Sequence, residues 1–293
     1  MQAMTHTNPP RHVLSEEELR FFREQGYLIR KILDDASVAR YVAAVDEARR
    51  ERGETQQRMS NLQFLQPGKA IRGIQDIICN EDILAVSRDL LGEGIIVDGA
   101  SLFYGEAGVD YRQGWHRDLM QVPDDQIDPR WFSADYHYNY VQANISLTPD
   151  PCLWIVPGSH RRPLNEAEQR IFGGDPRIAP VDAQPELDEG VQLVLQPGQA
   201  VFYNNYAVHR GYAGVLAERR ITIHLGFHSN QYEPTCHFGV LDHREYTTDY
   251  LASLAPQVRE ALLAHIAERA RHPQVDQYHA WHQQFISKEF VIK

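Results

Sequence analysis

Apolar side chains recur every three to four residues in four stretches of the chain, which is the spacing of one face of an α-helix. The first predicted helix begins after Ser15, which forms a capping box with Glu18, and it ends at Gly26. The other predicted helices cover residues 37–52, 80–92 and 256–271. The pattern therefore predicts helices toward both ends of the chain.

After residue 92 the hydrophobic pattern changes to short β-rich runs separated by Gly, Pro, Asn or Asp. Because these runs do not alternate with helical stretches, they favour an antiparallel sandwich or barrel over a sheet built from βα units. We predict a mainly β protein with flanking helices, a single domain over residues 15–293, and a flexible terminus over residues 1–14. The predicted strands cover residues 27–29, 95–97, 100–104, 141–147, 153–156, 191–195, 200–203 and 221–227.

Length and composition fit a soluble globular protein. The chain has 293 residues, of which 43% are hydrophobic and 24% charged, so it can bury a core without disulfide bonds. The longest uninterrupted apolar runs have five residues, whereas a membrane-spanning helix needs about 20. No secretory signal is expected near the start, and the three widely spaced cysteines suggest neither a disulfide framework nor a metal knuckle. We expect a cytoplasmic protein.

The formal net charge of −11 argues against a nucleic-acid partner, which a basic patch would bind. Charged clusters at residues 49–52 and 259–271 mix both signs at helical spacing, as solvated helix faces do. The sequence contains no Gly-rich phosphate loop, no GxSxG and no HExxH. We expect a small-molecule partner and no membrane, and the sequence carries no signal for an oligomeric state.

A candidate metal site begins with His116 and Asp118, which are two residues apart. On a strand, residues i and i+2 share a face, so an imidazole and a carboxylate would converge on one ion. A second imidazole must come from another strand, and His209 is the best candidate. Two histidines and one carboxylate leave three positions open on an octahedral ion, which suits ferrous iron that takes up O₂ and a bidentate co-substrate. A four-ligand structural zinc site leaves none.

Arg220 follows His209 by eleven residues and lies in an otherwise apolar run. A buried arginine is costly unless it is paired, and a guanidinium binds a carboxylate through two parallel hydrogen bonds. A dianionic co-substrate would meet that need. The alternative anchor is Arg219, which strand alternation places on the other face, away from Thr222.

These residues together resemble the phytanoyl-CoA dioxygenase family of non-haem iron(II), 2-oxoglutarate-dependent oxygenases. The Pro157–His160 element after a β run and the stretch Phe22–Tyr27 add to the resemblance, which covers about residues 15–245. It implies a double-stranded β-helix (jelly-roll) core flanked by helices. In one place the chain departs from the family pattern, since Asp150 and Pro151 stand where many members have Asn-Gly.

The resemblance also implies the cofactors and the residues that hold them. Iron(II) would be bound by His116, Asp118 and His209, and the co-substrate 2-oxoglutarate by Arg220 with Thr222 as a helper. The implied reaction is hydroxylation of a small molecule by O₂, with release of succinate and CO₂. Desaturation, ring closure or epimerisation would use the same ligands, whereas family members that halogenate have a small residue in place of the carboxylate.

Two other classes of protein compete with this interpretation. A non-catalytic ligand-binding protein could use the same jelly-roll scaffold, because a fold does not determine a function. The complete ligand set with an anchoring arginine argues against it. A zinc hydrolase could use the two histidines and the aspartate, but Arg220 would then have no task.

Candidates for contact with the substrate lie near the metal motif in the chain. The segment from Trp131 to Tyr140 is dense in aromatic residues and lies between the metal motif and the next predicted strand. Chain order brings this segment back toward the iron, so we predict that part of it forms a wall or lid of the pocket. The candidates are Tyr136, His137 and Tyr138 in that segment, with Trp115, Asn144 and, more weakly, Gln142 elsewhere. His160 is expected to have a structural role, whereas Arg117 fits a structural ion pair and a role at the site equally well.

Overall fold

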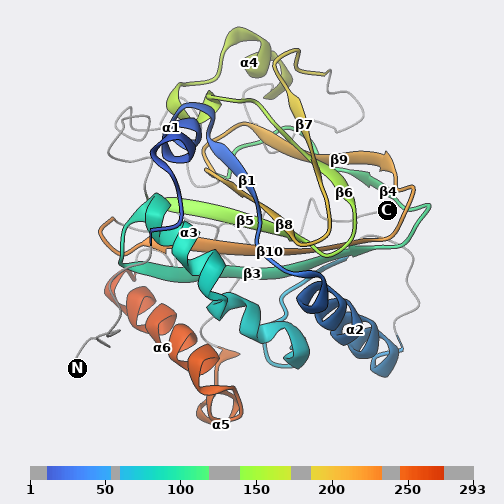
Figure 1. Cartoon of the computed structure of the whole chain (residues 1–293), viewed down its shortest axis with the longest axis vertical. Coiled ribbons are helices and arrows are strands. Elements are labelled where there is room, and N and C mark those ends of the chain that lie inside the picture. Colours follow the sequence, from blue (N-terminus) through green and yellow to red (C-terminus); the bar gives the residue numbers. More distant parts are fainter. Residues whose placement is uncertain (1–11, 54–59, 119–138, 173–185, 233–244, 274–293) are drawn as a thin grey trace.

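The computed structural model describes residues 12–53, 60–118, 139–172, 186–232 and 245–273 (Figure 1). The helices are α1 (Glu16–Gln25), α2 (Asp35–Glu51), α3 (Glu81–Leu91), α4 (Glu166–Phe172), α5 (Thr248–Ala252) and α6 (Pro256–Arg271), with 3₁₀ helices at Arg72–Cys79 (η1) and Ser159–Arg161 (η5). The strands are β1 (Tyr27–Lys31), β2 (Ser60–Leu62), β3 (Ile95–Gly105), β4 (Asp110–Arg112), β5 (Tyr140–Ser146), β6 (Asp150–Ile155), β7 (Val191–Leu195), β8 (Gln199–Tyr203), β9 (His209–Val215) and β10 (Arg220–Ser229).

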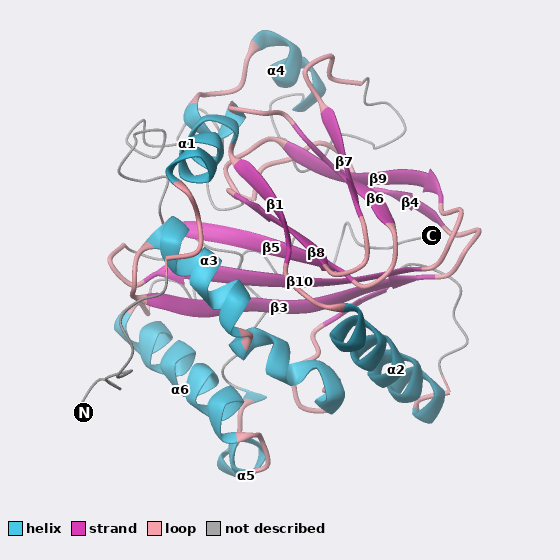
Figure 2. Cartoon of the chain, viewed as in Figure 1, coloured by secondary structure: helices cyan, strands magenta, loops and turns pink. Residues whose placement is uncertain are grey.

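The strands form two sheets, one with the order β1-β8-β5-β10-β3-β2 and one with the order β4-β9-β6-β7. All pairings within them are antiparallel. Figure 2 shows the two sheets with α2, α3 and α6 on the outer side of the larger one. The mainly β, jelly-roll architecture predicted from the sequence is therefore confirmed.

Local capping explains why the predicted ends of α1 agree with the structure. The Ser15 side chain accepts a hydrogen bond from the backbone amide of Glu18, and the Glu18 carboxylate accepts one from the amide of Ser15. The helix ends at Gly26, whose φ of 82° lies in the left-handed region that glycine adopts readily. The turn also brings the chain into β1.

The strands differ from the sequence prediction at β3 and β9, and β2 and β4 are also absent from the predicted set. Residues 95–97 and 100–104 belong to one continuous strand, β3, and the pairing register shifts opposite Gly99, between Gly226 and Phe227. A glycine inside a strand often marks such an irregularity. Strand β9 is absent from the predicted set, although His209 at its start is expected to lie on a strand. Its sequence HRGYAGV is polar and glycine-rich, and its pairing with β4 and β6 holds it in the sheet.

The largest hydrophobic cluster lies between the helices and the larger sheet. It joins residues of α2, η1, α3 and α6 to β3, β5 and β10, and a separate cluster fills part of the space between β6, β7 and β8. Burial of this apolar surface is the main free-energy gain of folding and fixes the larger sheet as a rigid support. No helix within the described ranges is long and apolar enough to span a bilayer.

Residues 12–14, which we expected to belong to a flexible terminus, are bound to α3. The backbone amides of Val13 and Leu14 donate to the Asp89 carboxylate at 2.7 and 2.8 Å. The His12 side chain contacts the other carboxylate oxygen. Residues 12–14, which precede the capping box of α1, are therefore held in place by contacts with α3.

Candidate metal centre

His116 and His209 lie directly opposite each other. After β4 ends at Arg112, the chain forms a single β-bridge in which the amide of His116 donates to the carbonyl of His209 at 2.8 Å and the amide of His209 donates back at 2.9 Å. We expected His116 and Asp118 on a regular strand, and the structure replaces that strand with one bridged residue. The bridge nevertheless brings the two imidazoles to the same place.

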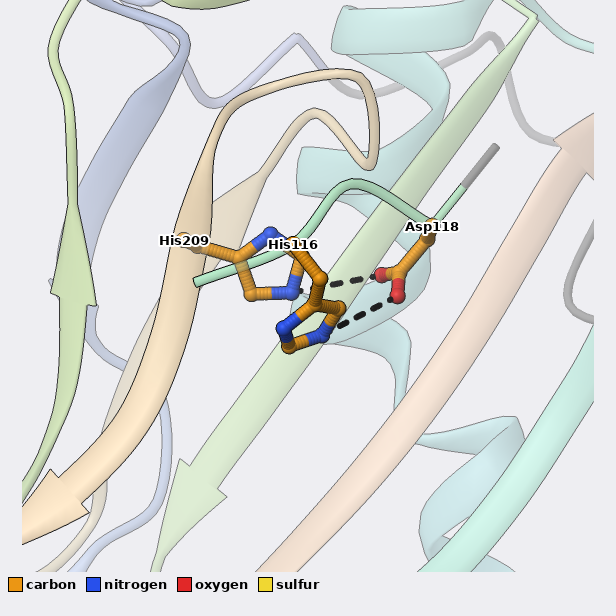
Figure 3. A group of neighbouring side chains, drawn as sticks. All are labelled: His116, Asp118 and His209. Atoms are coloured by element: carbon orange, nitrogen blue, oxygen red, sulfur yellow. Dashed lines mark ion pairs between the residues drawn. The ribbon is translucent and has the colours of Figure 1, made fainter. Parts of the chain in front are cut away.

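The three predicted ligand side chains point toward one another (Figure 3). Nε2 of His116 lies 3.5 Å from Oδ1 of Asp118, and Nε2 of His209 lies 3.4 Å from Oδ2. All three candidate ligand atoms fall within 4.8 Å of one another. With metal–ligand bonds of about 2.1 Å, adjacent ligands of an octahedral ion lie about 3 Å apart, so a small contraction would accommodate an ion. The site thus fits a divalent metal.

Both histidines are held in the tautomer that metal binding requires. Nδ1 of His116 lies 2.8 Å from the carbonyl oxygen of Gly114, and Nδ1 of His209 lies 2.9 Å from that of Ala207. A carbonyl can only accept, so each Nδ1 carries the proton and each Nε2 presents a lone pair toward Asp118. Among the residues that the structure describes, no second group of three potential metal ligands meets the same distance criterion.

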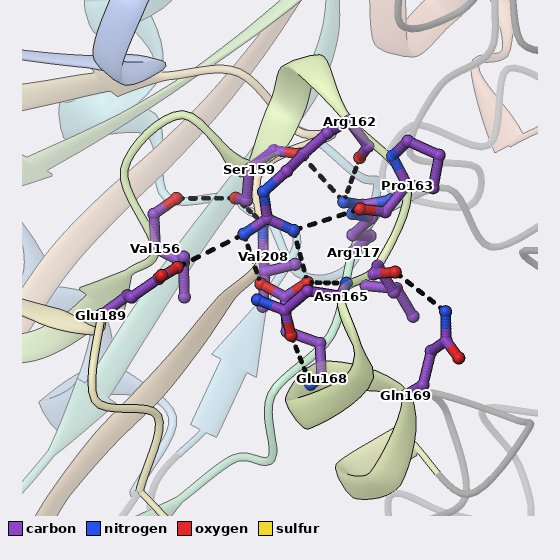
Figure 4. Close-up of polar contacts among 11 residues, drawn as sticks. Arg117, Val156, Ser159, Arg162, Pro163, Asn165, Glu168, Gln169, Glu189 and Val208 are labelled. Carbon is purple, nitrogen blue, oxygen red and sulfur yellow. Dashed lines mark hydrogen bonds and ion pairs between the residues drawn. The ribbon is translucent and has the colours of Figure 1, made fainter.

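The turn around Ser159 supports both segments that carry the predicted ligands (Figure 4). The Ser159 hydroxyl accepts from the amide of Val208 at 2.8 Å and donates to the carbonyl of Val156 at 2.6 Å. Arg117, between His116 and Asp118 in the chain, donates to the carbonyl oxygens of Ser159 and Arg162 at 2.9 and 2.8 Å. Arg117 therefore supports this turn through two backbone oxygens.

His160 connects the same turn to the N-terminal helix. Its Nε2 lies 3.1 Å from the carbonyl oxygen of Arg23. A Cβ atom at Gly26 would lie 2.5 Å from the His160 ring, so only glycine allows this close approach. The Phe22–Tyr27 stretch and the Pro157–His160 element, which are distant in sequence, therefore pack together.

Arg220 is buried, with 3% of its side chain exposed, and it is paired with Asp150. Its Nε donates to Oδ2 of Asp150 at 2.9 Å, and the Thr222 hydroxyl donates to the same oxygen at 2.5 Å. Burial alone would raise the pKa of the Asp150 carboxyl, but the Arg220 charge and the Thr222 hydroxyl outweigh it and hold that pKa below its ordinary value. Asp150 is therefore ionised, and it links the smaller sheet to the larger one.

Arg219 points to the surface of the protein. Its side chain is 38% exposed, and its Nη1 lies 2.9 and 3.2 Å from the two carboxylate oxygens of Asp46 on α2. Strand alternation thus separates the two arginines as expected, and only Arg220 faces the space between the sheets.

Polar residues that the sequence analysis missed connect the metal site to Arg220. Nε2 of Gln113 lies 3.5 Å from Nε2 of His116, and the Tyr111 hydroxyl lies 3.4 Å from Oε1 of Gln113. The Arg220 guanidinium lies 4.8 Å from the centre of the Tyr111 ring. A Cβ at Gly211 would come within 2.4 Å of the Tyr111 hydroxyl, so this glycine leaves room for the phenol. These residues lie on or beside the three-residue strand β4, whose short polar sequence gave no signal.

Tyr203 also borders the metal site. Its ring centre lies 5.1 Å from that of His209. Burial and the Asp118 charge raise the pKa of the Tyr203 phenol well above its ordinary value, so the phenol keeps its proton. Asn144, a predicted substrate residue, is buried in the neighbouring strand, and its Oδ1 has no hydrogen-bond partner in the described part of the chain.

The remaining substrate candidates fall in two groups. Trp115 has 0% exposure and packs in a hydrophobic cluster with Val156, Leu164 and Val208, and Arg210 lies 4.5 Å from its ring centre. This placement favours a packing role for Trp115 over a contact with substrate. Tyr136, His137 and Tyr138 lie outside the described residues.

Comparisons with known proteins agree with this architecture. A family model described as phytanoyl-CoA dioxygenase matches residues 11–220. Dioxygenase lolE1 of Epichloe uncinata is 24% identical over 245 residues, which cover 79% of this chain and 89% of that protein. That relative is named as a dioxygenase.

Two solved structures share the fold. The non-haem alpha-ketoglutarate-dependent carbocyclase SnoK from nogalamycin biosynthesis has a TM-score of 0.54 and 22% identity, covering 76% of this chain and 88% of that one. HygX from Streptomyces hygroscopicus, with nickel and 2-oxoglutarate bound, has a TM-score of 0.60 and 16% identity, covering 74% of this chain and 88% of that one. At these identities the likeness shows a common fold.

Proposed function

Because the chain belongs to the phytanoyl-CoA dioxygenase family of iron(II), 2-oxoglutarate-dependent oxygenases, we propose that His116, Asp118 and His209 bind its iron and that Arg220 binds 2-oxoglutarate. The enzyme class and the two cofactors that the sequence resemblance implied are confirmed by this membership. The single observation that carries the ligand assignment is the convergence of two imidazole Nε2 atoms on one buried carboxylate.

The geometry of the three ligands supports a centre with open positions. Each Nδ1–H is bound to a carbonyl, so neither imidazole can turn away, and Asp118 is held by its amide, which donates to the carbonyl of Asn205 at 3.0 Å. When bound there, iron(II) together with 2-oxoglutarate would supply the O₂-activating chemistry that oxidises a C–H bond and releases succinate and CO₂. The protein residues orient the reactants and exclude water.

Arg220 fits a carboxylate of the co-substrate. Its Nη1 is buried and has no hydrogen-bond partner within the described ranges, and a buried unsatisfied donor of this kind is costly. A carboxylate arriving beside Tyr111 would satisfy it. Thr222 was expected to bind the same carboxylate, but its hydroxyl donates to Asp150, so we assign Thr222 to holding Asp150.

The substrate is a small molecule, and we propose hydroxylation as the reaction. Asn144 offers the substrate a buried hydrogen-bond acceptor near Tyr203. We still predict that Tyr136, His137 and Tyr138 form a wall of the substrate pocket. We also propose one domain over residues 15–293 and a cytoplasmic location, which the free thiols of Cys79 and Cys152 support. Desaturation, ring closure and epimerisation would use the same ligands.

Succinate formation from 2-oxoglutarate by the iron-loaded protein tests this function. Wild-type protein should form succinate in the presence of O₂ and ascorbate, and Asp118→Ala should lose both bound metal and succinate formation. Asp110→Ala, at an exposed carboxylate in the same region of the chain, is the matched control and should retain both. Near-normal turnover by Asp118→Ala would show that the ligand assignment is wrong, and a wild type without turnover would favour a binding protein or a hydrolase.

A further inference from the structure

A carboxylate of the protein itself already contacts the proposed co-substrate anchor. Asp150 accepts three hydrogen bonds: from the amide of Cys152 at 2.9 Å, from Nε of Arg220 at 2.9 Å and from the hydroxyl of Thr222 at 2.5 Å. With 3% of its side chain exposed, it is buried together with the arginine. A carboxylate with this many donors is a fixed part of the site.

Among the described residues, Arg220 is hydrogen-bonded to Asp150 through Nε alone. Asp150 uses the Nε side, whereas the buried Nη1 has no hydrogen-bond partner among the described residues. The aromatic rings of Tyr111 and Phe103 lie 4.8 and 5.4 Å from the guanidinium carbon, and rings supply no countercharge. An incoming carboxylate can therefore bind only as a second anion on the same cation.

We propose that Asp150 is a resident counter-ion of Arg220, which fixes the guanidinium through Nε and lowers the affinity of Arg220 for the distal carboxylate of 2-oxoglutarate. The inference rests on the proposed role of Arg220 and adds a residue that positions it and adjusts its effective charge. Thr222 takes part by holding the Asp150 oxygen that faces the guanidinium.

The ion pair between Asp150 and Arg220 affects both the stability of the protein and its affinity for the co-substrate. Without co-substrate, Asp150 compensates the buried charge of Arg220, which would otherwise destabilise the fold. With co-substrate, two carboxylates share one cation in a poorly solvated site, and their repulsion opposes binding. Asp150 thus stabilises the free enzyme at the expense of affinity.

The departure from the family pattern suggests the most informative variant. Asn has nearly the same shape as Asp and can still accept from the amide of Cys152, but it carries no charge. Asp150→Asn should therefore keep the turn while removing the counter-ion. We expect 2-oxoglutarate to bind the nickel-loaded variant about tenfold more tightly than nickel-loaded wild type.

Calorimetric titration of the nickel-loaded proteins measures the affinity for 2-oxoglutarate without turnover. The second probe is 2-oxobutyrate, which has the same keto acid but no distal carboxylate, and its affinity should not change in Asp150→Asn. Asp46→Asn, which removes the partner of the exposed Arg219, is the matched control and should bind both acids as wild type does.

Different results would contradict the counter-ion role of Asp150 and the proposed function on which it rests. Unchanged or weaker binding of 2-oxoglutarate by Asp150→Asn, with normal binding by wild type, would overturn the counter-ion role. Absence of 2-oxoglutarate binding by wild type would instead overturn the proposed function. If Asp150→Asn does not fold alone, it should fold with added succinate and not with butyrate, and failure of succinate to restore the fold would also overturn the inference.

Discussion

The side-chain oxygen of Ser159 accepts a hydrogen bond from the backbone amide of Val208 at 2.8 Å, one residue before His209. The carbonyl of the same Ser159 accepts from Arg117, which lies between His116 and Asp118 (Figure 4). One turn therefore supports the two chain segments that carry the proposed ligands. Because Ser159, Val208 and Arg117 are buried, loss of this connection should affect the proposed metal site.

Ser159→Ala should therefore weaken metal binding. The change leaves the buried amide of Val208 without its partner, which costs about 1–3 kcal/mol, and residues that orient metal ligands typically contribute about 10- to 100-fold in affinity. Nickel titration would show the loss of affinity, and thermal unfolding would show the loss of stability. Ser253→Ala, at an exposed hydroxyl that donates to the carbonyl of Tyr250, should change metal affinity little. A lower melting temperature with unchanged metal affinity in Ser159→Ala would contradict the supporting role.

Arg220→Leu and Arg219→Leu should have different effects on 2-oxoglutarate. The first removes a buried charge partner and should weaken binding by about 2–5 kcal/mol, whereas the second removes a half-exposed surface ion pair and should change it little. Calorimetric titration of the nickel-loaded variants measures both, and the reverse ranking would transfer the anchor to Arg219.

Measurements of stability separate a role of Arg220 in binding from a role in the fold. Arg220→Leu strands the buried carboxylate of Asp150, so it should also lower the free energy of unfolding, by about 3–5 kcal/mol. The double variant Asp150→Asn/Arg220→Leu should regain part of that stability and still bind 2-oxoglutarate poorly. Recovery of binding together with stability would mean that Arg220 acts only on the fold.

His228 makes the stability of the protein depend on pH. Burial lowers the pKa of its imidazole below the ordinary value of 6.5, and the nearby charges of Arg269 and Arg271 act in the same direction, while Asp98 opposes them. Glu268 also faces the ring, with its Oε1 3.9 Å from Nε2. Because the unfolded chain binds this proton more readily, the free energy of unfolding should be fully retained above about pH 6.5 and fall below it.

Denaturant unfolding at several pH values between 5 and 8 would test this dependence. His228→Gln should lose less stability than wild type as the pH falls below 6.5, because it removes a group that must be desolvated in its charged form. Parallel pH profiles for wild type and His228→Gln would contradict the assignment.

Tyr136→Ala and His137→Ala should uncouple the reaction. If these residues form the predicted wall or lid, their loss leaves the target C–H bond badly placed, and small misplacement lowers the rate steeply. Substrate oxidation should fall, succinate formed per product should rise, and binding of iron and 2-oxoglutarate should persist. A role in packing alone predicts the opposite combination, a lower melting temperature with normal coupling.

Local patterns in the sequence determined most of the elements and the proposed ligands. The ends of α1 and α3 were predicted because Ser15, Gly26 and Asn80 satisfy helix termini within a few residues of themselves. The pair His116 and Asp118 was recognised because its members are neighbours in the chain, and the burial of Arg220 follows from the apolar run that surrounds it. Such signals act over a single turn or strand.

Only the tertiary structure decided which distant residues meet. Asp150 and Arg220 are 70 residues apart and belong to different sheets, and their ion pair depends on how the two sheets stack. The weakly β-forming strand β9 is ordered by β4 and β6, and its pairing brings Tyr111 beside Gly211. The register between strands far apart in sequence is set by the packing of the whole core, and no local pattern of residues encodes it.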